Sequence, residues 1–165
     1  MLDVSRIIVD GAILSVAASL LILISLRVNP RIWLHDYPRD VQAMVPPKTE
    51  RERRLSLIVG IPFLLVLAAI PFASTLSLKS DYQGQVSLAT LAIHAFAVAF
   101  AFNVVDWLVL DWLLFCTITP ALVVIPGSEG APGYKDYGFH FRGFLIGTAI
   151  SAVAGMVIGA IVWLI

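Results

Sequence analysis

The sequence predicts an all-α, polytopic integral membrane protein in which residues 1–165 form a single membrane domain, a bundle of four transmembrane helices. Hydrophobic residues make up 59% of the chain and charged residues 13%, whereas soluble domains carry about 45–50% apolar and about 25% charged residues. Crossing the hydrocarbon core takes about 20 predominantly apolar residues at a rise of ~1.5 Å each. Four stretches are long enough, at approximately residues 7–26, 55–76, 86–118 and 144–165.

The first stretch is expected to remain as a helix rather than to be cleaved as a signal peptide. A signal peptide begins with a basic region followed by a short apolar core of about 7–15 residues. Here Asp3 and Asp10 lie beside Arg6, and the apolar run has the length of a full span.

The segment 27–54 that follows is rich in cations, and this bias orients the chain. It contains Arg27, Arg31, Arg39, Lys48, Arg51, Arg53 and Arg54, whereas the link 77–85 contains only Lys79. Lys and Arg gather in cytoplasmic loops. We therefore expect loops 27–54 and 119–143 to be cytoplasmic, and both termini to lie on the non-cytoplasmic side of the cell membrane.

Local signals within 27–54 predict a short interfacial helix and the start of the second span. The short helix is expected to be capped near Asp36 and stopped by Pro46 and Pro47. Thr49 and Glu52 form a capping box ahead of the apolar run. The second span itself contains two prolines, which membrane helices tolerate. Near its entrance, Arg51, Arg53 and Arg54 are suited to anchoring at the headgroups, with a specific contact to anionic headgroups as the alternative.

The third stretch is too long for one simple span. Residues 86–119 would extend ~51 Å as a continuous helix, against ~30 Å of hydrocarbon. The favoured solution is a single helix that runs on into the cytoplasmic interface until Pro120. Five spans, with a turn near residues 102–106, are the minor alternative. In the sequence DWLVLDWLLF, Asp106 and Asp111 would diverge by ~140° on an α-helix, so they are not expected to share a face.

The fourth stretch carries the most regular pattern in the chain, because small residues recur at every fourth position. They are Gly143, Gly147, Ser151, Gly155 and Gly159. Small residues let helices approach closely in lipid, where close packing drives association. The first stretch has a shorter match in Gly11, Ser15 and Ser19. The first and fourth helices are therefore expected to be partners within one chain, and packing against another copy is the competing interpretation.

Three polar segments are expected to converge at the cytoplasmic face. They supply the candidate site residues Asp106, Asp111, His35, Asp36, Asp136, His140 and Arg142. Ionisable groups near the membrane are candidates for function. The alternative is a network that only ties the loops to the bundle. No compact metal-ligand, nucleophile or phosphate-loop motif is present, so no metal, cofactor or catalytic residue is predicted.

Three classes of function stay open. The favoured one is a structural or accessory membrane subunit with a polar cluster at its cytoplasmic face. The alternatives are a small transporter or ion-conducting oligomer, and a membrane-embedded enzyme that acts on a lipid-type substrate at the cytoplasmic leaflet. The expected partners are the lipid bilayer and either further copies of the chain or a larger membrane complex. A net charge of zero gives no reason to expect nucleic acid.

Overall fold

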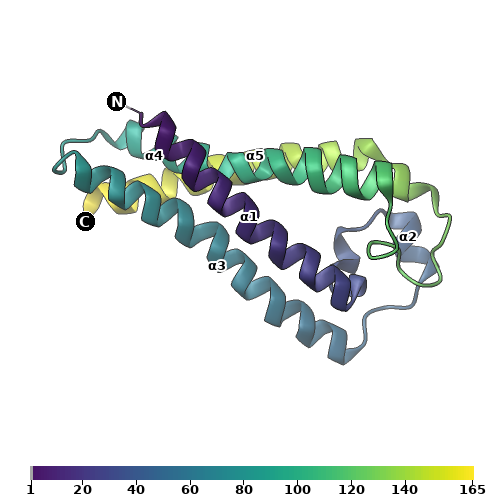
Figure 1. Cartoon of the computed structure of the whole chain (residues 1–165). Helices are drawn as coiled ribbons and strands as arrows, with labels where there is room; N and C mark the ends of the chain where they lie inside the picture. Colours follow the sequence, from purple (N-terminus) through teal and green to yellow (C-terminus); the bar gives the residue numbers. More distant parts are fainter. Residues whose placement is uncertain (1) are drawn as a thin grey trace.

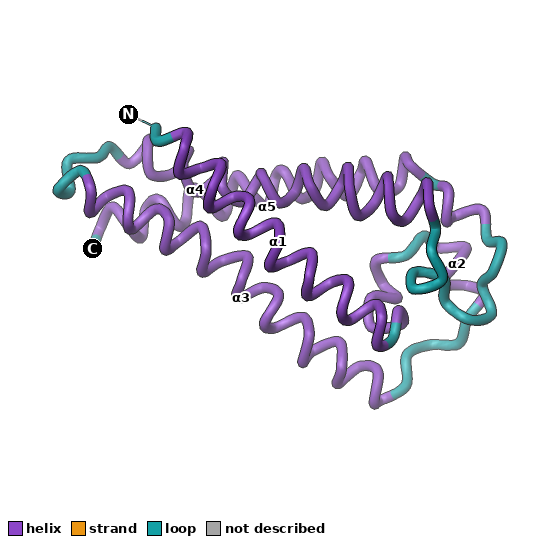
Figure 2. The backbone as a smooth tube through the Cα atoms, viewed as in Figure 1, coloured by secondary structure: helices purple, strands orange, loops and turns teal. Residues whose placement is uncertain are grey.

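The computed structural model describes residues 2–165 and is all-helical over that range (Figures 1 and 2). Four helical runs are long and apolar enough to cross a membrane. They are α1 (Val4–Val28), α3 (Glu50–Asp81), α4 (Leu88–Val105) continued without a break by η2 (Asp106–Ile118), and α5 (Tyr137–Leu164). Both termini and the link between α3 and α4 lie at one end of the bundle, hereafter the terminal end (Figure 1).

The opposite end is covered by a cap, which we define as residues 29–49 and 119–136. It contains the short elements η1 (Pro30–Asp36), α2 (Arg39–Met44) and η3 (Pro132–Lys135). The predicted interfacial helix exists as α2, but its N-cap residue is Pro38 and not Asp36, which ends η1 instead. The cap and the adjoining helix ends enclose a hydrophobic core of their own, which includes Tyr37, Val41, Phe115, Val123, Ile125 and Tyr134.

Hydrogen bonds in this core join the two segments of the cap. The Tyr37 hydroxyl donates to the Val123 carbonyl at 2.8 Å, and the Ile125 N–H donates to the Tyr134 hydroxyl at 2.9 Å. A third bond runs from the Gly133 N–H to the Asp40 carboxylate at 2.6 Å. Buried polar groups without partners are costly. These bonds therefore fix one arrangement of two segments that are far apart in the sequence.

Helix α4 packs against all three other long helices, most extensively against α5, and α3 also contacts α1 and α5. The expected pairing of the first and fourth helices is wrong, because α1 and α5 each pack on α4. A Cβ atom added to Gly159 would lie 2.6 Å from the Ala92 Cα atom, and one added to Gly11 would lie 2.7 Å from the Ala101 Cβ atom. These glycines allow backbones to approach more closely than any side chain would permit.

The other small residues of the predicted stripes differ in their surroundings. Gly155 lies against Phe96 in the same way as Gly159 lies against Ala92, and Ser151 is buried. Gly147 faces the Asn103 side chain. Gly143, in contrast, is exposed and has open space around it. Ser15 is buried and donates to the Gly11 carbonyl of its own helix at 2.7 Å.

Helix α3 starts at the predicted capping box, and both of its hydrogen bonds are present between Thr49 and Glu52. From the terminal end toward the cap, α3 diverges from α4 and α5 (Figure 1). Most of its large side chains near the cap are exposed, including Leu57, Ile61 and Leu64 at 56–64%. Edge-to-face contacts of Phe63 with Trp33 and Phe102 link this half of the helix to the rest.

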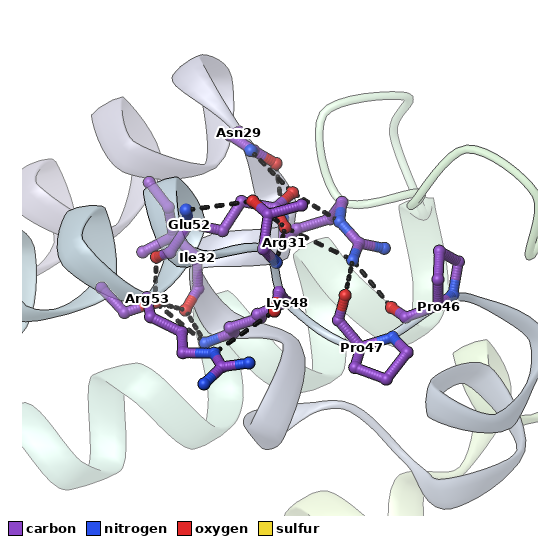
Figure 3. A network of polar contacts seen from close by, with 10 residues as sticks. Asn29, Arg31, Ile32, Pro46, Pro47, Lys48, Glu52 and Arg53 are labelled. Carbon is purple, nitrogen blue, oxygen red and sulfur yellow. Dashed lines mark hydrogen bonds and ion pairs between the residues drawn. The ribbon is translucent and has the colours of Figure 1, made fainter.

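A polar network ties the cap to the start of α3 (Figure 3). The Arg31 guanidinium contacts the Glu52 carboxylate at 2.6 Å, and both side chains are largely buried. Arg31 also donates to the carbonyls of Pro46 and Pro47 at 2.7 and 3.1 Å. Hydrogen bonds between ionised groups are among the stronger polar contacts in proteins. The network therefore holds the residues before α3 in place.

Candidate functional site beneath the cap

The stretch DWLVLDWLLF lies in η2, which is a π-helix over Asp106–Ile118. Hydrogen bonds in a π-helix join residues five apart, and such segments are rare and frequent at functional sites. Residues five apart then return to nearly the same face. Trp107 and Trp112 illustrate this, because their ring centroids are 4.7 Å apart. The expectation that Asp106 and Asp111 face different directions is wrong, since it assumed α-helical geometry.

Asp111 is paired with His140, which lies in the first turns of α5. Asp111 Oδ1 and His140 Nδ1 are 2.9 Å apart, and the His140 side chain is only 6% exposed. An ionised carboxylate only accepts hydrogen bonds, so Nδ1 of the neutral ring carries the proton. The other ring nitrogen, Nε2, then presents a lone pair. It is buried and has no hydrogen-bond partner among residues 2–165.

Asp36 approaches this pair from the cap. The Asp36 side chain is exposed at the surface, yet the protein atoms around its carboxyl group raise its pKa, mainly through desolvation and in part through the negative charge of Asp111. The positive charges of Lys48 and His35 oppose this rise. A charge effect between Asp36 and Asp111 shows that η1 and η2 bring their acids to the same region.

Asp106 belongs to the same group of acids. Its side chain is half-buried, and the charges nearest to its carboxyl group are those of Asp111 and Asp36. Next to it, the Trp107 ring stacks on Phe144 of α5 at 4.3 Å between centroids. The indole N–H of Trp107 is buried without a partner in the described part of the chain. The site therefore contains two unpartnered buried nitrogen groups close to the end of one helix pair.

Three of the predicted site residues do not join this group. Asp136 caps α5 by accepting a hydrogen bond from the Phe139 N–H at 2.8 Å. Arg142 is exposed. His35 is also exposed, and its influence on the site is the charge effect on Asp36. The structure thus brings together Asp36, Asp106, Asp111 and His140.

Sequence reasoning assigned Lys48 only to loop charge, yet it lies beside the site. The side chain is buried, and Nζ donates to the Ile32 carbonyl at 2.5 Å and to the Ser56 hydroxyl at 2.9 Å. Burial lowers the pKa of Lys48, while the acids Asp36 and Glu52 counteract that effect. The available signal was its position directly after Pro46 and Pro47 and directly before the capping box, where the backbone has little freedom.

The end of η2 is held by a second lysine. Lys135 Nζ donates to the carbonyls of Cys116 and Thr117 at 2.6 and 3.1 Å and contacts the Thr119 hydroxyl at 2.7 Å. Thr119 ends η2 with a left-handed backbone at φ 48°. The last carbonyls of a helix lack partners within it and favour a cation. Lys135 therefore stabilises the π-helical segment that positions Asp106 and Asp111.

The arrangement can accept a proton or a hydrogen bond at His140 Nε2 and can donate one from Trp107. Within residues 2–165, no cluster of three His, Cys, Asp or Glu side chains is placed to hold a metal ion. Comparison with known proteins adds no further constraint: a scan against models of protein families, a search of curated proteins and a search of solved structures each found no match.

Proposed function

We propose that this protein is a small multi-pass membrane protein that binds the polar head of an amphiphilic, lipid-type molecule at the site beneath its cap. The observation that carries the proposal is the Asp111–His140 pair, whose free imidazole nitrogen is buried without a partner among residues 2–165. Native proteins rarely leave such groups unsatisfied, and each exception calls for an explanation. A ligand atom that donates a hydrogen bond to Nε2 would supply the missing partner.

The charges of the site favour a head group that carries an amine or a hydroxyl. Asp36, Asp106 and Asp111 contribute three carboxyl groups, whereas Lys48 is already engaged with Ile32 and Ser56. A cation is the favoured partner of such a group, because a nearby positive charge favours the ionised form of a carboxyl group. Tyr137 and Phe141 are each 40% exposed beside it and offer an apolar surface on which a tail can lie.

The cation-rich loops support a cytoplasmic position for this site, and the termini would then lie on the other side of the cell membrane. In this orientation η2 is the interfacial extension of the third span. Arg51, Arg53 and Arg54 are exposed at the start of α3, where they would meet anionic headgroups.

The proposal can be tested with dodecylamine and dodecyl phosphate as probes of equal chain length. Binding to the full chain in nanodiscs is followed through tryptophan fluorescence, to which Trp107 and Trp112 beside the site contribute. Dodecylamine should bind saturably to the wild type. His140→Gln and Asp111→Asn should weaken binding about 10- to 100-fold, because a hydrogen bond to a charged group contributes about 1.5–3 kcal/mol. Arg142→Gln is the control, because this side chain is exposed and does not join the site, and it should bind like the wild type.

Two results would refute the binding proposal. One is equal binding of the amine by all four proteins, which would indicate partition into lipid. The other is equal binding of the amine and the phosphate, which would show that the acids play no part.

A second candidate is the structural or accessory membrane subunit. It is favoured by the polar cap residues whose hydrogen bonds hold structural elements together. Asp136 caps α5, Lys135 caps η2, and Asp40 accepts a hydrogen bond from the Gly133 N–H. On this view the Asp111–His140 pair is one more tie, between η2 and α5. Asp111→Asn would then lower the unfolding temperature while neither probe binds the wild type.

A further inference from the structure

A second polar cluster lies toward the terminal end and joins three helices. Ser74 of α3 contacts Asp10 of α1 through its hydroxyl, with 2.6 Å between Oγ and Oδ2, and contacts His94 of α4 with 2.8 Å between Oγ and Nε2. Ser74 is 5% exposed, His94 is fully buried and Asp10 is half-buried. Asp10 is therefore the member of this cluster that lies nearest to solvent or headgroups.

This cluster is separate from the site beneath the cap. His94 and Asp106 are 12 residues apart on one helical run, or ~18 Å at 1.5 Å per residue. Between them lies an apolar layer of buried side chains from α1 and α4, which includes Leu14, Val98 and Phe102. A proton at His94 can therefore exchange with the terminal end more readily than with the cap.

The hydrogen count of the cluster is the central observation. A serine hydroxyl has one proton and can donate to only one of its two partners. In one fully bonded arrangement, His94 donates from Nε2 to Ser74, and Ser74 donates to ionised Asp10. The His94 Nδ1 atom then has no proton. In this structure Nδ1 is buried and has no partner within the described residues.

The reverse arrangement is also fully bonded and contains one more proton. Protonated Asp10 donates to Ser74, Ser74 donates to His94 Nε2, and the ring carries its proton on Nδ1. The first arrangement holds two protons and the second holds three. One hydronium ion converts the first into the second: Nδ1 accepts its proton, the Nε2 proton passes to Ser74, the Ser74 proton passes to Asp10, and the hydronium ion leaves as water.

The charges around the cluster are few and lie at its outer edge. On α1, Arg6 and Asp3 act on the His94 ring together with Asp10. From the end of α3, Asp81 pairs with Arg6, and Lys79 donates to the Val162 and Trp163 carbonyls of α5. Helix α4 has no other ionisable side chain between residues 88 and 105, and α5 has none after residue 142.

We propose that Asp10, Ser74 and His94 form a proton-binding site, which takes up one proton at His94 Nδ1 by reversing the direction of its hydrogen bonds. The ligand is a proton, and the site is independent of ligand binding beneath the cap. Because each of the three residues belongs to a different helix, the protonation state is coupled to the packing of α1 on α3 and α4.

Nitrogen-15 NMR of the histidine rings in the full-length protein tests this proposal, with the His94 signal assigned by its loss in His94→Gln. In the wild type, the neutral His94 ring should carry its proton on Nε2 at high pH and on Nδ1 after acidification. Asp10→Asn removes the carboxylate that accepts the Ser74 proton, so the ring proton should stay on Nε2, and any remaining protonation of His94 should have a midpoint shifted by about one pH unit or more.

Variants at two neighbouring positions show whether Ser74 transmits the effect. In a Ser74→Ala background, Asp10→Asn should change the His94 midpoint much less. Thr75→Val is the matched control, because the Thr75 hydroxyl is equally buried but bonds only to the Pro71 carbonyl of its own helix. It should titrate like the wild type. If Ser74→Ala does not fold, Ser74→Thr keeps a hydroxyl and should preserve the coupling.

Two outcomes would overturn the proposal. In one, His94 keeps its ring proton on Nε2 over the whole pH range in which the protein is folded. In the other, the effect of Asp10→Asn on the His94 midpoint is absent, or is the same with and without the Ser74 hydroxyl.

Discussion

Replacing Gly159 by alanine tests how closely α5 is packed on α4. The added Cβ atom would lie 2.6 Å from the Ala92 Cα and N atoms and 2.9 Å from its Cβ atom. Carbon atoms in contact are normally about 3.5–4.0 Å apart, so the two helices must separate by about 1 Å. A gap of that size removes about a quarter to a half of the attraction between facing atoms. Overpacking of this kind typically costs about 1–3 kcal/mol.

Gly143→Ala on the same helix is the matched control, since nothing lies within 4 Å of the added atom. Both variants gain about 1 kcal/mol of helix propensity, which cancels in the comparison. Gly159→Ala should therefore be less stable than Gly143→Ala by about 1–3 kcal/mol. The assay is reversible unfolding in mixed micelles with increasing SDS, followed by tryptophan fluorescence.

Equal stability of the two alanine variants would refute the packing argument. Protein concentration provides a second check. The partner of the stripe is α4 of the same chain, so the difference should not depend on concentration. A difference that shrinks on dilution would instead place the stripe between two copies.

Three further predictions concern the cap. A double-mutant cycle of Arg31→Met and Glu52→Gln, measured by the same unfolding assay, should give a coupling of about 1–3 kcal/mol, and a value near zero would contradict the buried ion pair. Gly133→Ala places a Cβ atom against the Asp40 carboxylate. It should lower stability by about 1–3 kcal/mol, most of which Asp40→Ala should restore. Because desolvation raises the pKa of Asp36 above its ordinary value of 3.8, the stability from its protonated form is fully present below that value and is lost as pH rises through the folded pKa. Asp36→Asn should therefore gain in unfolding temperature relative to the wild type between pH 4 and pH 7, and a constant difference would contradict this sign.

The number and position of the long helices follow from the sequence because they depend on local properties. Apolar length predicts each run, and the Thr49–Glu52 capping box predicts where α3 begins. The partner of a helix is a different matter. The glycine stripe of α5 indicates close packing, but small residues carry no information about which helix they meet. The pairing of α5 with α4 and not with α1 therefore could not be predicted from the sequence.

The candidate site shows the same division. Asp106 and Asp111 were identified as unusual, yet their relative direction was predicted from α-helical periodicity. The Asp-Trp pair recurs after five residues, which is the hydrogen-bond step of a π-helix, so this repeat was the available signal. The pairing of Asp111 with His140 joins residues from two helices. It depends on the packing of η2 against α5, which no local pattern encodes.

Because the cap is built from two segments that are far apart in the sequence, it can assemble only late in synthesis. Tyr37 and Val41 emerge early, whereas their core partners Val123 and Tyr134 are made only after α3 and α4. Chains fold from the N-terminal side as they are synthesised. The apolar side chains of residues 29–49 therefore stay uncovered until residues 119–136 have been synthesised. A chain that ends before residue 134 would contain α1, α3 and α4 but would lack Tyr134 in the core of the cap and His140 in the candidate site.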